Sequence, residues 1–303
     1  MAEIVLLDGG MGQELIRRRG APASALWSAA VLADQPELVG SVHRDFIDAN
    51  AKVIVANSYA ITRPRLARNA AAERFEELQI RALDIAEQAC RGAEGVVIAG
   101  GLSPLTGSYQ PGSTLPFEEC VKQYSEIVAL QRDRVDLFIA ETMCTADEAL
   151  SALEAIKTSG KPAWIAFTVD DKDGSKLRSG EPLREAADAA VSEGAAAILI
   201  NCSSPEAVDT AMYQLTDLPV PYGGYANGFK TVEPLTNEST VDVLEAREDV
   251  TPSAYADHVD RWIAVGATIV GGCCEIGPDH IQEIADRLSA NGHSIVAMPA
   301  AQR

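Results

Sequence analysis

Short apolar runs recur along the whole chain, and each is bounded by glycine, asparagine or proline. The runs are continuous rather than alternating, which is typical of parallel strands that are covered on both faces. Among them, the run at 220–222 is the weakest strand candidate, because Pro221 cannot donate a hydrogen bond to a neighbouring strand. The eight runs lie at residues 4–7, 53–56, 96–99, 137–140, 163–167, 197–200, 220–222 and 267–270.

The segments between these runs follow a helical period, with apolar side chains three and four positions apart. The expected helices lie at residues 13–19, 38–47, 75–89, 117–128, 149–156 and 281–288. Eight strands that alternate with helices predict an α/β protein, with residues 1–303 forming a single (β/α)8 TIM-type barrel domain. A doubly wound open sheet is the main alternative. The first strand is not followed by a G-x-G-x-x-G pattern, which weakens that alternative.

The connection from Phe229 to Val250 is long and polar and has no clear period. A loop of this size within a compact domain is often functional. The role of residues 229–250 stays open, and one hypothesis is a lid over the pocket of a substrate donor. The sequence shows no domain boundary, internal repeat or low-complexity tract.

Composition and charge narrow the range of functions. Hydrophobic residues make up 47% of the 303 residues and charged residues 23%, which are globular values. A net charge of −19, from 25 basic and 44 acidic residues, argues against nucleic acid and anionic membrane surfaces as partners. A cationic small substrate would be attracted, although solubility explains the charge equally well. Without a membrane span or signal peptide, we expect a cytoplasmic protein, whose oligomeric state the sequence does not predict.

Three of the six cysteines fall where a barrel would bring them together. Cys202 follows the expected strand at 197–200, and Cys273 and Cys274 follow the strand at 267–270. In a reducing compartment we expect thiols, and three thiolates with one open position are typical of a catalytic zinc site. Soft thiolates favour zinc over magnesium or calcium. The alternative is that buried cysteines act as small hydrophobes, which we favour for the other three.

Further candidates for substrate binding lie at strand ends, where a barrel forms its active site. Each has a structural alternative: Asp8 would also fit a helix cap, Glu141 a buried ion pair, and an aromatic residue ordinary packing. The candidates are Asp8, Gly9, Gly10, Trp27, Tyr59, Glu141, Asn201 and Asn227.

Over essentially its whole length, the chain resembles the homocysteine S-methyltransferase family. The resemblance is carried by residues 8–15, 26–29, 57–59, 141–142 and 201–202, and most specifically by the Gly-Gly-Cys-Cys sequence at 271–274. The family is a zinc-dependent TIM barrel with three cysteine ligands. The resemblance therefore implies that Cys202, Cys273 and Cys274 bind zinc. The Leu-Trp-Ser-Ala sequence at 26–29 resembles the branch of the family that uses S-methylmethionine.

The activity that the resemblance implies is transfer of a methyl group from an onium donor to the thiol of homocysteine, which gives methionine. S-methylmethionine is the preferred donor; betaine, a dimethylsulfonium compound and S-adenosylmethionine are alternatives. Another thiol or a selenol is an alternative acceptor. Zinc suits this chemistry, because a free thiol with a pKa of about 8.5 is mostly protonated at neutral pH and coordination deprotonates it.

The resemblance also implies roles for individual residues. Asp8 and Glu141 would hold the ammonium group of homocysteine, and backbone N–H groups of the two glycines after Asp8 would take its carboxylate. Apart from the resemblance, Trp27 and Tyr59 are candidates for the donor pocket, because aromatic rings attract diffuse cations.

The chain departs from the family pattern at several positions. Leu199 stands where glycine is common, Ala226 where proline is common, and Glu275 and Ile276 follow the cysteine pair. An acid at position 275 would favour a cationic donor or repel the homocysteine carboxylate. Two functions from other classes stay open: a zinc hydrolase with an acidic general base, and a non-enzymatic zinc or thiol sensor.

Overall fold

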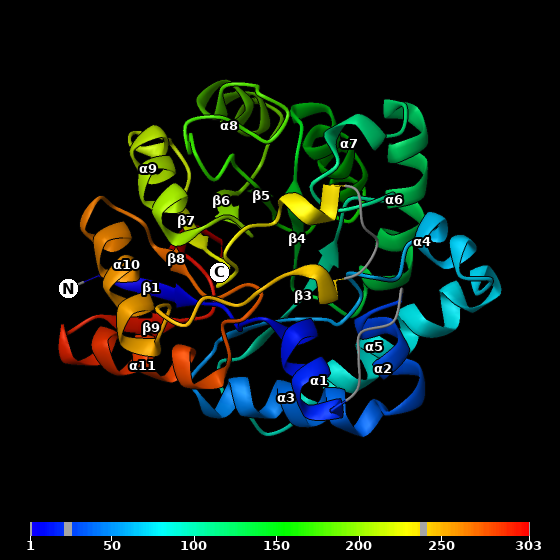
Figure 1. The fold of residues 1–303 in the computed structure, drawn as a ribbon, viewed down its shortest axis with the longest axis horizontal. Helices are drawn as coiled ribbons and strands as arrows, with labels where there is room; N and C mark the ends of the chain where they lie inside the picture. Colours follow the sequence, from blue (N-terminus) through cyan, green and yellow to red (C-terminus); the bar gives the residue numbers. More distant parts are fainter. Residues whose placement is uncertain (1, 21–25, 237–240, 303) are drawn as a thin grey trace.

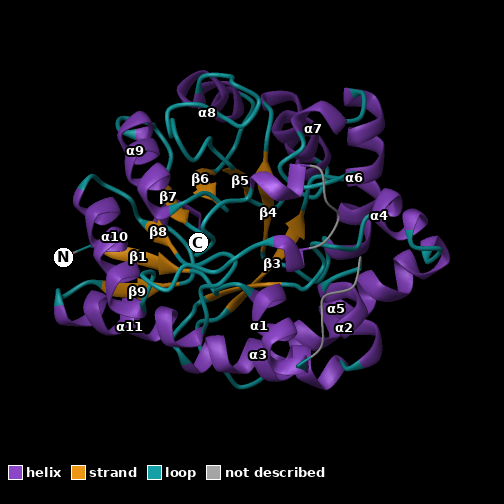
Figure 2. Cartoon of the chain, viewed as in Figure 1, coloured by secondary structure: helices purple, strands orange, loops and turns teal. Residues whose placement is uncertain are grey.

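The computed structural model describes residues 2–20, 26–236 and 241–302. At its centre lies a curled sheet of nine parallel strands in the order β2-β3-β4-β5-β6-β7-β8-β1-β9, and helices surround this sheet (Figure 1, Figure 2). The strands are β1 (Glu3–Leu6), β2 (Val53–Val55), β3 (Val97–Leu102), β4 (Leu137–Met143), β5 (Ala163–Phe167), β6 (Ala197–Asn201), β7 (Tyr222–Tyr225), β8 (Ile269–Val270) and β9 (Ser294–Val296).

Eleven α-helices are present in the described part of the chain, and those expected from the sequence are among them. Their bounds are α1 (Met11–Arg19), α2 (Ser28–Asp34), α3 (Pro36–Asp48), α4 (Arg63–Arg68), α5 (Phe75–Cys90), α6 (Phe117–Gln131), α7 (Ala146–Lys157), α8 (Leu183–Ser192), α9 (Pro205–Leu215), α10 (Pro252–Ala264) and α11 (Pro278–Ala290). No helix in the described ranges is long and apolar enough to cross a membrane.

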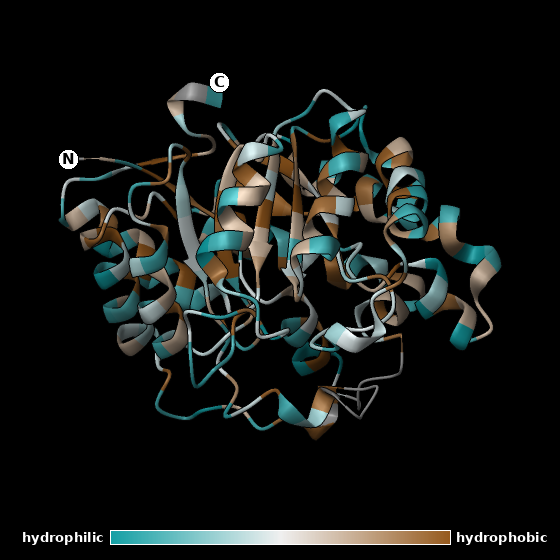
Figure 3. Ribbon diagram, turned by 90° about the horizontal axis from the view of Figure 1, so that it is seen from above, coloured by the Kyte–Doolittle hydropathy of each residue, from teal (hydrophilic) through white to brown (hydrophobic). Residues whose placement is uncertain are grey.

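The apolar runs form strands because both faces of the sheet are covered. Successive residues of one strand point to opposite faces. Ile4 and Leu6 therefore pack into the outer cluster under the helices, whereas Val5 and Leu7 pack into a second cluster inside the curled sheet. Figure 3 shows the surrounding helices with hydrophobic and hydrophilic residues on different faces. This two-sided burial accounts for the continuous apolar runs in the sequence.

The sheet matches the expected closed barrel of eight strands only in part. A ninth strand, β9, pairs with β1 along residues Glu3, Ile4 and Val5. β2 therefore meets β1 only beyond that pairing, through a single bridge between Leu7 and Val53. The sheet is curled but open at this seam.

Polar N-caps begin several helices directly after the strand-end loops. Thr62, Thr145, Ser204 and Thr251 each accept a hydrogen bond from a backbone N–H in the first turn of the following helix. Such caps satisfy amides that lack partners within the helix. They fix where each loop ends, and hence how the loops around the carboxyl edge of the sheet are arranged.

The opposite end of the curled sheet is filled by the last residues of the chain. The indole Nε1 of Trp164, on β5, donates to Gln302 Oε1 (2.7 Å), and Gln302 Nε2 donates to the carbonyl oxygen of Ala196 (2.7 Å). Met298 packs against the inner cluster. Figure 3 shows this C-terminal turn at the opposite end of the molecule from the strand-end loops.

Candidate active site

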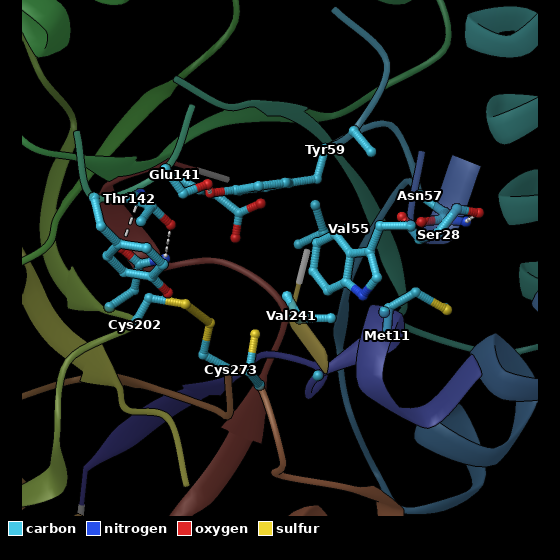
Figure 4. A pocket seen from close by; sticks show the side chains of 18 of the residues that line it. Met11, Ser28, Val55, Asn57, Tyr59, Glu141, Thr142, Cys202, Val241 and Cys273 are labelled. Carbon is cyan, nitrogen blue, oxygen red and sulfur yellow. Dashed lines mark hydrogen bonds between the residues drawn. A yellow bond between two sulfur atoms is a disulfide. The ribbon is translucent and has the colours of Figure 1, made fainter. Parts of the chain in front are cut away.

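A cavity of about 550 Å³ opens at the carboxyl ends of the strands. It is lined by all the predicted site residues except Asn227. Figure 4 shows the sulfur atoms of Cys202 and Cys273 on one side of the cavity and the side chain of Tyr59 on the other. The position of the cavity matches the edge at which parallel α/β proteins bind their ligands.

Cys202, Cys273 and Cys274 come together in this cavity, and their sulfur atoms all lie within 4.8 Å of one another. One expectation is wrong: not all six cysteines are thiols, because Cys202 and Cys273 form a disulfide. The cause lies in the fold, since the ends of β6 and β8 bring their Cα atoms to 5.7 Å, within disulfide reach. Cys274 stays a free thiol, and burial raises its pKa to about 12.

Backbone hydrogen bonds hold the cysteine-bearing loops in place. Cys202 N–H donates to the carbonyl oxygen of Tyr225 (3.3 Å), and Cys273 N–H to that of Ala226 (2.9 Å). Ala226 N–H in turn donates to the hydroxyl of Tyr255, and this hydroxyl donates to the carbonyl oxygen of Gly271 (2.8 Å). Because a proline has no N–H, alanine at position 226 permits a link that the common family residue would remove.

Two acids lie in the same cavity, with Asp8 buried and Glu141 partly buried. Asp8, which follows β1, accepts a hydrogen bond from Val55 N–H on β2 (3.0 Å) and thereby ties the seam of the sheet. Glu141, on β4, accepts one from the hydroxyl of Tyr225 (3.0 Å). Burial raises the pKa of Glu141 to about 7. Burial, with the charge of Glu141, also holds the pKa of Asp8 well above its ordinary value. A cationic group would stabilise both carboxylates.

Asn201 positions other residues rather than standing free in the cavity. Its Oδ1 accepts from Thr142 N–H and its Nδ2 donates to Thr142 Oγ1, both at 2.9 Å. This pair joins the ends of β4 and β6, which carry Glu141 and Cys202. Among the described residues, eight non-glycine residues have positive φ, and four of these line the cavity: Trp27, Tyr109, Thr142 and Cys202. Backbone strain of this kind is typical of functional sites.

The glycines after Asp8 are required by close backbone contact. Gly10 N–H donates to the carbonyl oxygen of Ile276 (2.8 Å), so this amide is not available for the homocysteine carboxylate that the resemblance would place there. A Cβ at Gly10 would lie 2.4 Å from the carbonyl oxygen of Cys273 and 3.0 Å from Cys274 Cα. Gly10 therefore lets the loop after β1 pack directly against the cysteine pair.

Replacing Gly10 with alanine is expected to push the cysteine pair out of place, because backbone atoms cannot yield as a flexible side chain can. We expect a loss of about 1–3 kcal/mol in the free energy of unfolding and reduced zinc uptake by the reduced protein. Chemical denaturation and metal analysis would measure both. Gly112→Ala is the matched control, because a Cβ there meets nothing within 4 Å. Equal behaviour of the two variants would contradict this role of Gly10.

Trp27 and Tyr59 form one aromatic wall of the cavity. Their ring centroids are 5.9 Å apart in an edge-to-face arrangement. Gly12 leaves space for the indole, since a Cβ at position 12 would lie 2.1 Å from it. The indole Nε1 donates to Gln13 Oε1 (3.3 Å), and Gln13 Nε2 donates to Glu275 Oε1 (2.6 Å). Glu275 is not among the residues that line the cavity, so it acts on the indole through Gln13.

The structure differs from the predicted site in a few places. Asn227 is buried behind the cavity, where its Oδ1 accepts from Phe229 N–H (3.0 Å) and fixes the turn after β7. Tyr225 was not predicted as a site residue, although its position at the end of an expected strand indicates that it could line the site. Tyr109 was also missed, since it lies in the loop after β3 with no local pattern to mark it.

Parts of the long connection lie over the cavity. Phe229, Leu235 and Val241 line it, and Gln110 Nε2 donates to the carbonyl oxygen of Leu235 (2.9 Å). Residues 237–240 of the hypothesised lid lie outside the described residues. The described parts contribute apolar side chains that cover Cys202 and Cys274.

The donor set fits a thiophilic cation. Three sulfur atoms converge within one buried cluster, and two carboxylates lie in the same cavity. Once reduced, three thiolates this close would repel one another unless a cation lay between them. Three sulfur ligands with space beside them suit zinc, with one position left for a substrate.

Fold and site together define a parallel α/β enzyme with three clustered cysteines at the carboxyl ends of its strands. The chain belongs to the homocysteine S-methyltransferase family, whose model matches residues 5–288.

Known proteins of this family resemble the chain along its length. It is 29% identical to "Homocysteine S-methyltransferase 4" of Zea mays, over 92% of this chain and 88% of that protein. It is 28% identical to "Selenocysteine methyltransferase" of Astragalus bisulcatus, over 94% of this chain and 92% of that protein. The homocysteine methyltransferase MmuM from Escherichia coli superposes with TM-scores of 0.78 in its metallated form and 0.79 in its oxidized form, at 26% and 27% identity. Each superposition covers 94% of this chain and 96% of the MmuM chain.

Proposed function

We propose that the protein transfers a methyl group from an onium donor to the thiol of homocysteine and so makes methionine. One observation carries this proposal: a single cavity holds three cysteine sulfurs, two acids and an aromatic pair. These are the groups needed to bind a thiol, an ammonium group and a cationic methyl donor. Membership of the family supports the same reaction.

Cys202, Cys273 and Cys274 are the proposed zinc ligands, and they can bind the metal only when the Cys202–Cys273 disulfide is reduced. When bound, zinc supplies a Lewis acid that lowers the pKa of a coordinated substrate thiol towards neutrality. A reducing compartment keeps the ligands competent, which supports a cytoplasmic location. One relative has been solved in a metallated form, which supports a metal in this family.

The side chains of the protein provide binding and alignment. Glu141 and Asp8 hold the ammonium group of homocysteine, whose positive charge relieves the cost of their burial. Trp27 and Tyr59 face the methyl donor and hold its cationic centre by attraction to their rings. Covering residues such as Phe229 and Leu235 exclude water. Because the thiol attacks the methyl carbon directly, alignment is the main contribution of the chain.

S-methylmethionine is the proposed donor, since Trp27 belongs to the Leu-Trp-Ser-Ala sequence by which the chain resembles the branch that uses this donor. We further infer that residues 1–303 act as one domain and that the curled sheet is a TIM-type barrel. The bridge between Leu7 and Val53 and the ring of helices outside the sheet support this inference.

Methionine formation by reduced, zinc-loaded protein tests the proposal. Homocysteine would be supplied with S-methylmethionine, betaine, dimethylsulfoniopropionate or S-adenosylmethionine in separate reactions. We expect turnover with S-methylmethionine above the other donors. Turnover with another donor alone would overturn the donor assignment, and no turnover with any donor despite bound zinc would overturn the reaction.

A second acceptor belongs in the same assay, because one relative is named a selenocysteine methyltransferase. Selenocysteine carries a selenol where homocysteine carries a thiol, so both are soft nucleophiles suited to the same metal. Faster methylation of selenocysteine than of homocysteine at equal concentrations would reassign the acceptor. Release of substrate carboxylate or amine without methyl transfer would instead support the hydrolase alternative.

A further inference from the structure

Side chains of both charges line the cavity. Asp8 and Glu141 are the acids of the lining, and Arg65 and Arg68 are its arginines. Both arginines belong to the short helix α4, which follows the loop after β2. In a chain with a net charge of −19, two arginines in the lining of this cavity call for a specific explanation.

Arg65 is a partly buried cation without a carboxylate partner. Its Nη2 donates to the carbonyl oxygen of Pro104 (2.9 Å) and to Ser108 Oγ (3.2 Å), and its buried Nε has no hydrogen-bond partner. No carboxylate oxygen in the described part of the chain lies within 4.0 Å of its guanidinium. Glu148 is close enough to influence Arg65 electrostatically, but its Oε2 accepts from Cys144 N–H instead (2.9 Å).

Two other arginines, one on this helix and one elsewhere, have carboxylate partners, whereas Arg68 is exposed to solvent. Arg63, two residues earlier, is half exposed and forms an ion pair with Glu126. Arg178, elsewhere at the same edge of the sheet, is paired with Asp171 (3.1 Å). Arginine stays charged under all ordinary conditions. Leaving such a charge partly buried and without an anion is costly, unless a bound ligand supplies the anion.

Arg65 also lies directly beside the proposed donor wall. Its guanidinium carbon is 5.3 Å from the centre of the Tyr59 ring. Ser108 Oγ, which accepts from Arg65, lies 2.8 Å from the Tyr59 hydroxyl. Tyr59 packs against Trp27, so one connected group contains an aromatic surface for a cation and a guanidinium for an anion. Such a group matches a zwitterion that carries both charges a few bonds apart.

We propose that Arg65 binds the carboxylate of the methyl donor, so that the donor class is an onium compound with a free carboxylate. This inference rests on the proposed function and adds an anchoring site to it. A planar guanidinium with a free Nε suits a carboxylate through two parallel hydrogen bonds. Arg68, which is exposed and donates to the carbonyl oxygen of Thr106, adds positive charge at the entrance.

Comparison of Arg65→Gln with the wild type tests the inference with two donors, S-methylmethionine and its carboxamide. We expect the variant to raise the KM for S-methylmethionine by about 10- to 100-fold, and to leave the KM for the carboxamide within about twofold. The KM for homocysteine should not change. Arg63→Gln is the matched control on the same helix and should leave all three KM values unchanged.

Calorimetric titration provides a readout that does not depend on turnover. Each donor would be titrated into zinc-loaded protein with homoserine, which has no thiol, in the acceptor site. We expect the wild type, but not Arg65→Gln, to bind S-methylmethionine more tightly than the carboxamide. Equal binding of the two donors by the wild type would overturn the inference. A rise in the KM for homocysteine alone would also overturn it, because the site would then hold the acceptor carboxylate. Absence of turnover with tight, Arg65-dependent donor binding would instead count against the proposed reaction.

Discussion

Cys274→Ser is expected to lose zinc and nearly all methyl transfer activity. Serine offers a hard, protonated oxygen in place of a soft thiolate, and two cysteines alone do not complete the donor set. Changes next to a metal already cost 10- to 100-fold in affinity or activity, so loss of a ligand should cost at least about 100-fold. Cys274 is the best of the three to replace, because it is a free thiol and its replacement leaves the Cys202–Cys273 pair intact.

Metal content and methionine formation should fall together in this variant. Cys90→Ser is the control, since Cys90 is a partly buried free cysteine far along the chain from the cluster. It should keep about one zinc per chain and full turnover. If Cys274→Ser kept both its metal and its activity, Cys274 would not be a ligand.

Glu141→Gln is expected to weaken homocysteine binding strongly while it stabilises the fold. Glutamine keeps the hydrogen bond from Tyr225 but has no charge for the ammonium group of the substrate. Loss of one partner of a buried charge pair costs 2–5 kcal/mol, so kcat/KM for homocysteine should fall by about 100-fold. Initial rates measured over a range of homocysteine concentrations at pH 8 would give kcat/KM for both proteins and test this.

The same variant should change the pH dependence. Burial raises the pKa of Glu141 to about 7, so in the wild type kcat/KM should fall as the pH drops below 7 and this carboxylate takes up a proton. Glu141→Gln should lose that inflection. An inflection near 7 that persisted in the variant would belong to another group.

Stability should respond to pH in the opposite sense. The folded pKa of Glu141 is raised from 4.5 to about 7, so the folded state disfavours the ionised form, and the cost grows as the pH rises from 4.5 to 7. Above pH 7 we expect Glu141→Gln to be more stable than the wild type by about 1–2 kcal/mol, after allowance for partial exposure of the side chain. Below pH 4.5 the two proteins should unfold alike.

Glu148→Gln is the matched control for Glu141→Gln. Burial raises the pKa of Glu148 to about 7 as well, but its carboxylate accepts a backbone N–H from Cys144 and does not line the cavity. This variant should share the gain in stability at high pH without the loss of homocysteine binding. If both variants lost binding equally, the effect of Glu141 would be general rather than specific to the substrate.

Strands and their ends were predictable because the signals are local. The runs at 137–140 and 197–200 are continuously apolar, which follows from burial on both faces of the sheet. Parallel strands bring their carboxyl ends to one edge, so the residues after those runs were expected to meet. This reasoning placed Glu141 and Cys202 in one cavity, and the structure has them there.

Features that depend on distant contacts were not predictable. Strand β9 is three residues long and partly exposed, and it exists because β1 has an edge for it to pair with. Gln13 and Glu275 are 262 residues apart, so their hydrogen bond has no local pattern. Arg65 cannot be distinguished by sequence from its neighbours Arg63 and Arg68. Tertiary packing of α4 leaves Arg65 partly buried with an unpartnered Nε, whereas Arg63 pairs with Glu126 and Arg68 is exposed.

The end of the curled sheet opposite the cavity is closed, and this affects the order in which substrates bind and products leave. The inner cluster occupies the ring below the cavity, and Gln302 closes its other end by bonding to Trp164. Substrates and products therefore share one mouth, at the strand-end loops. Asp8 and Cys274, at the homocysteine site, are buried, whereas Trp27 and Tyr59 of the donor wall are partly exposed. We therefore expect homocysteine to arrive before the donor, and the methionine made from homocysteine to leave after the demethylated donor.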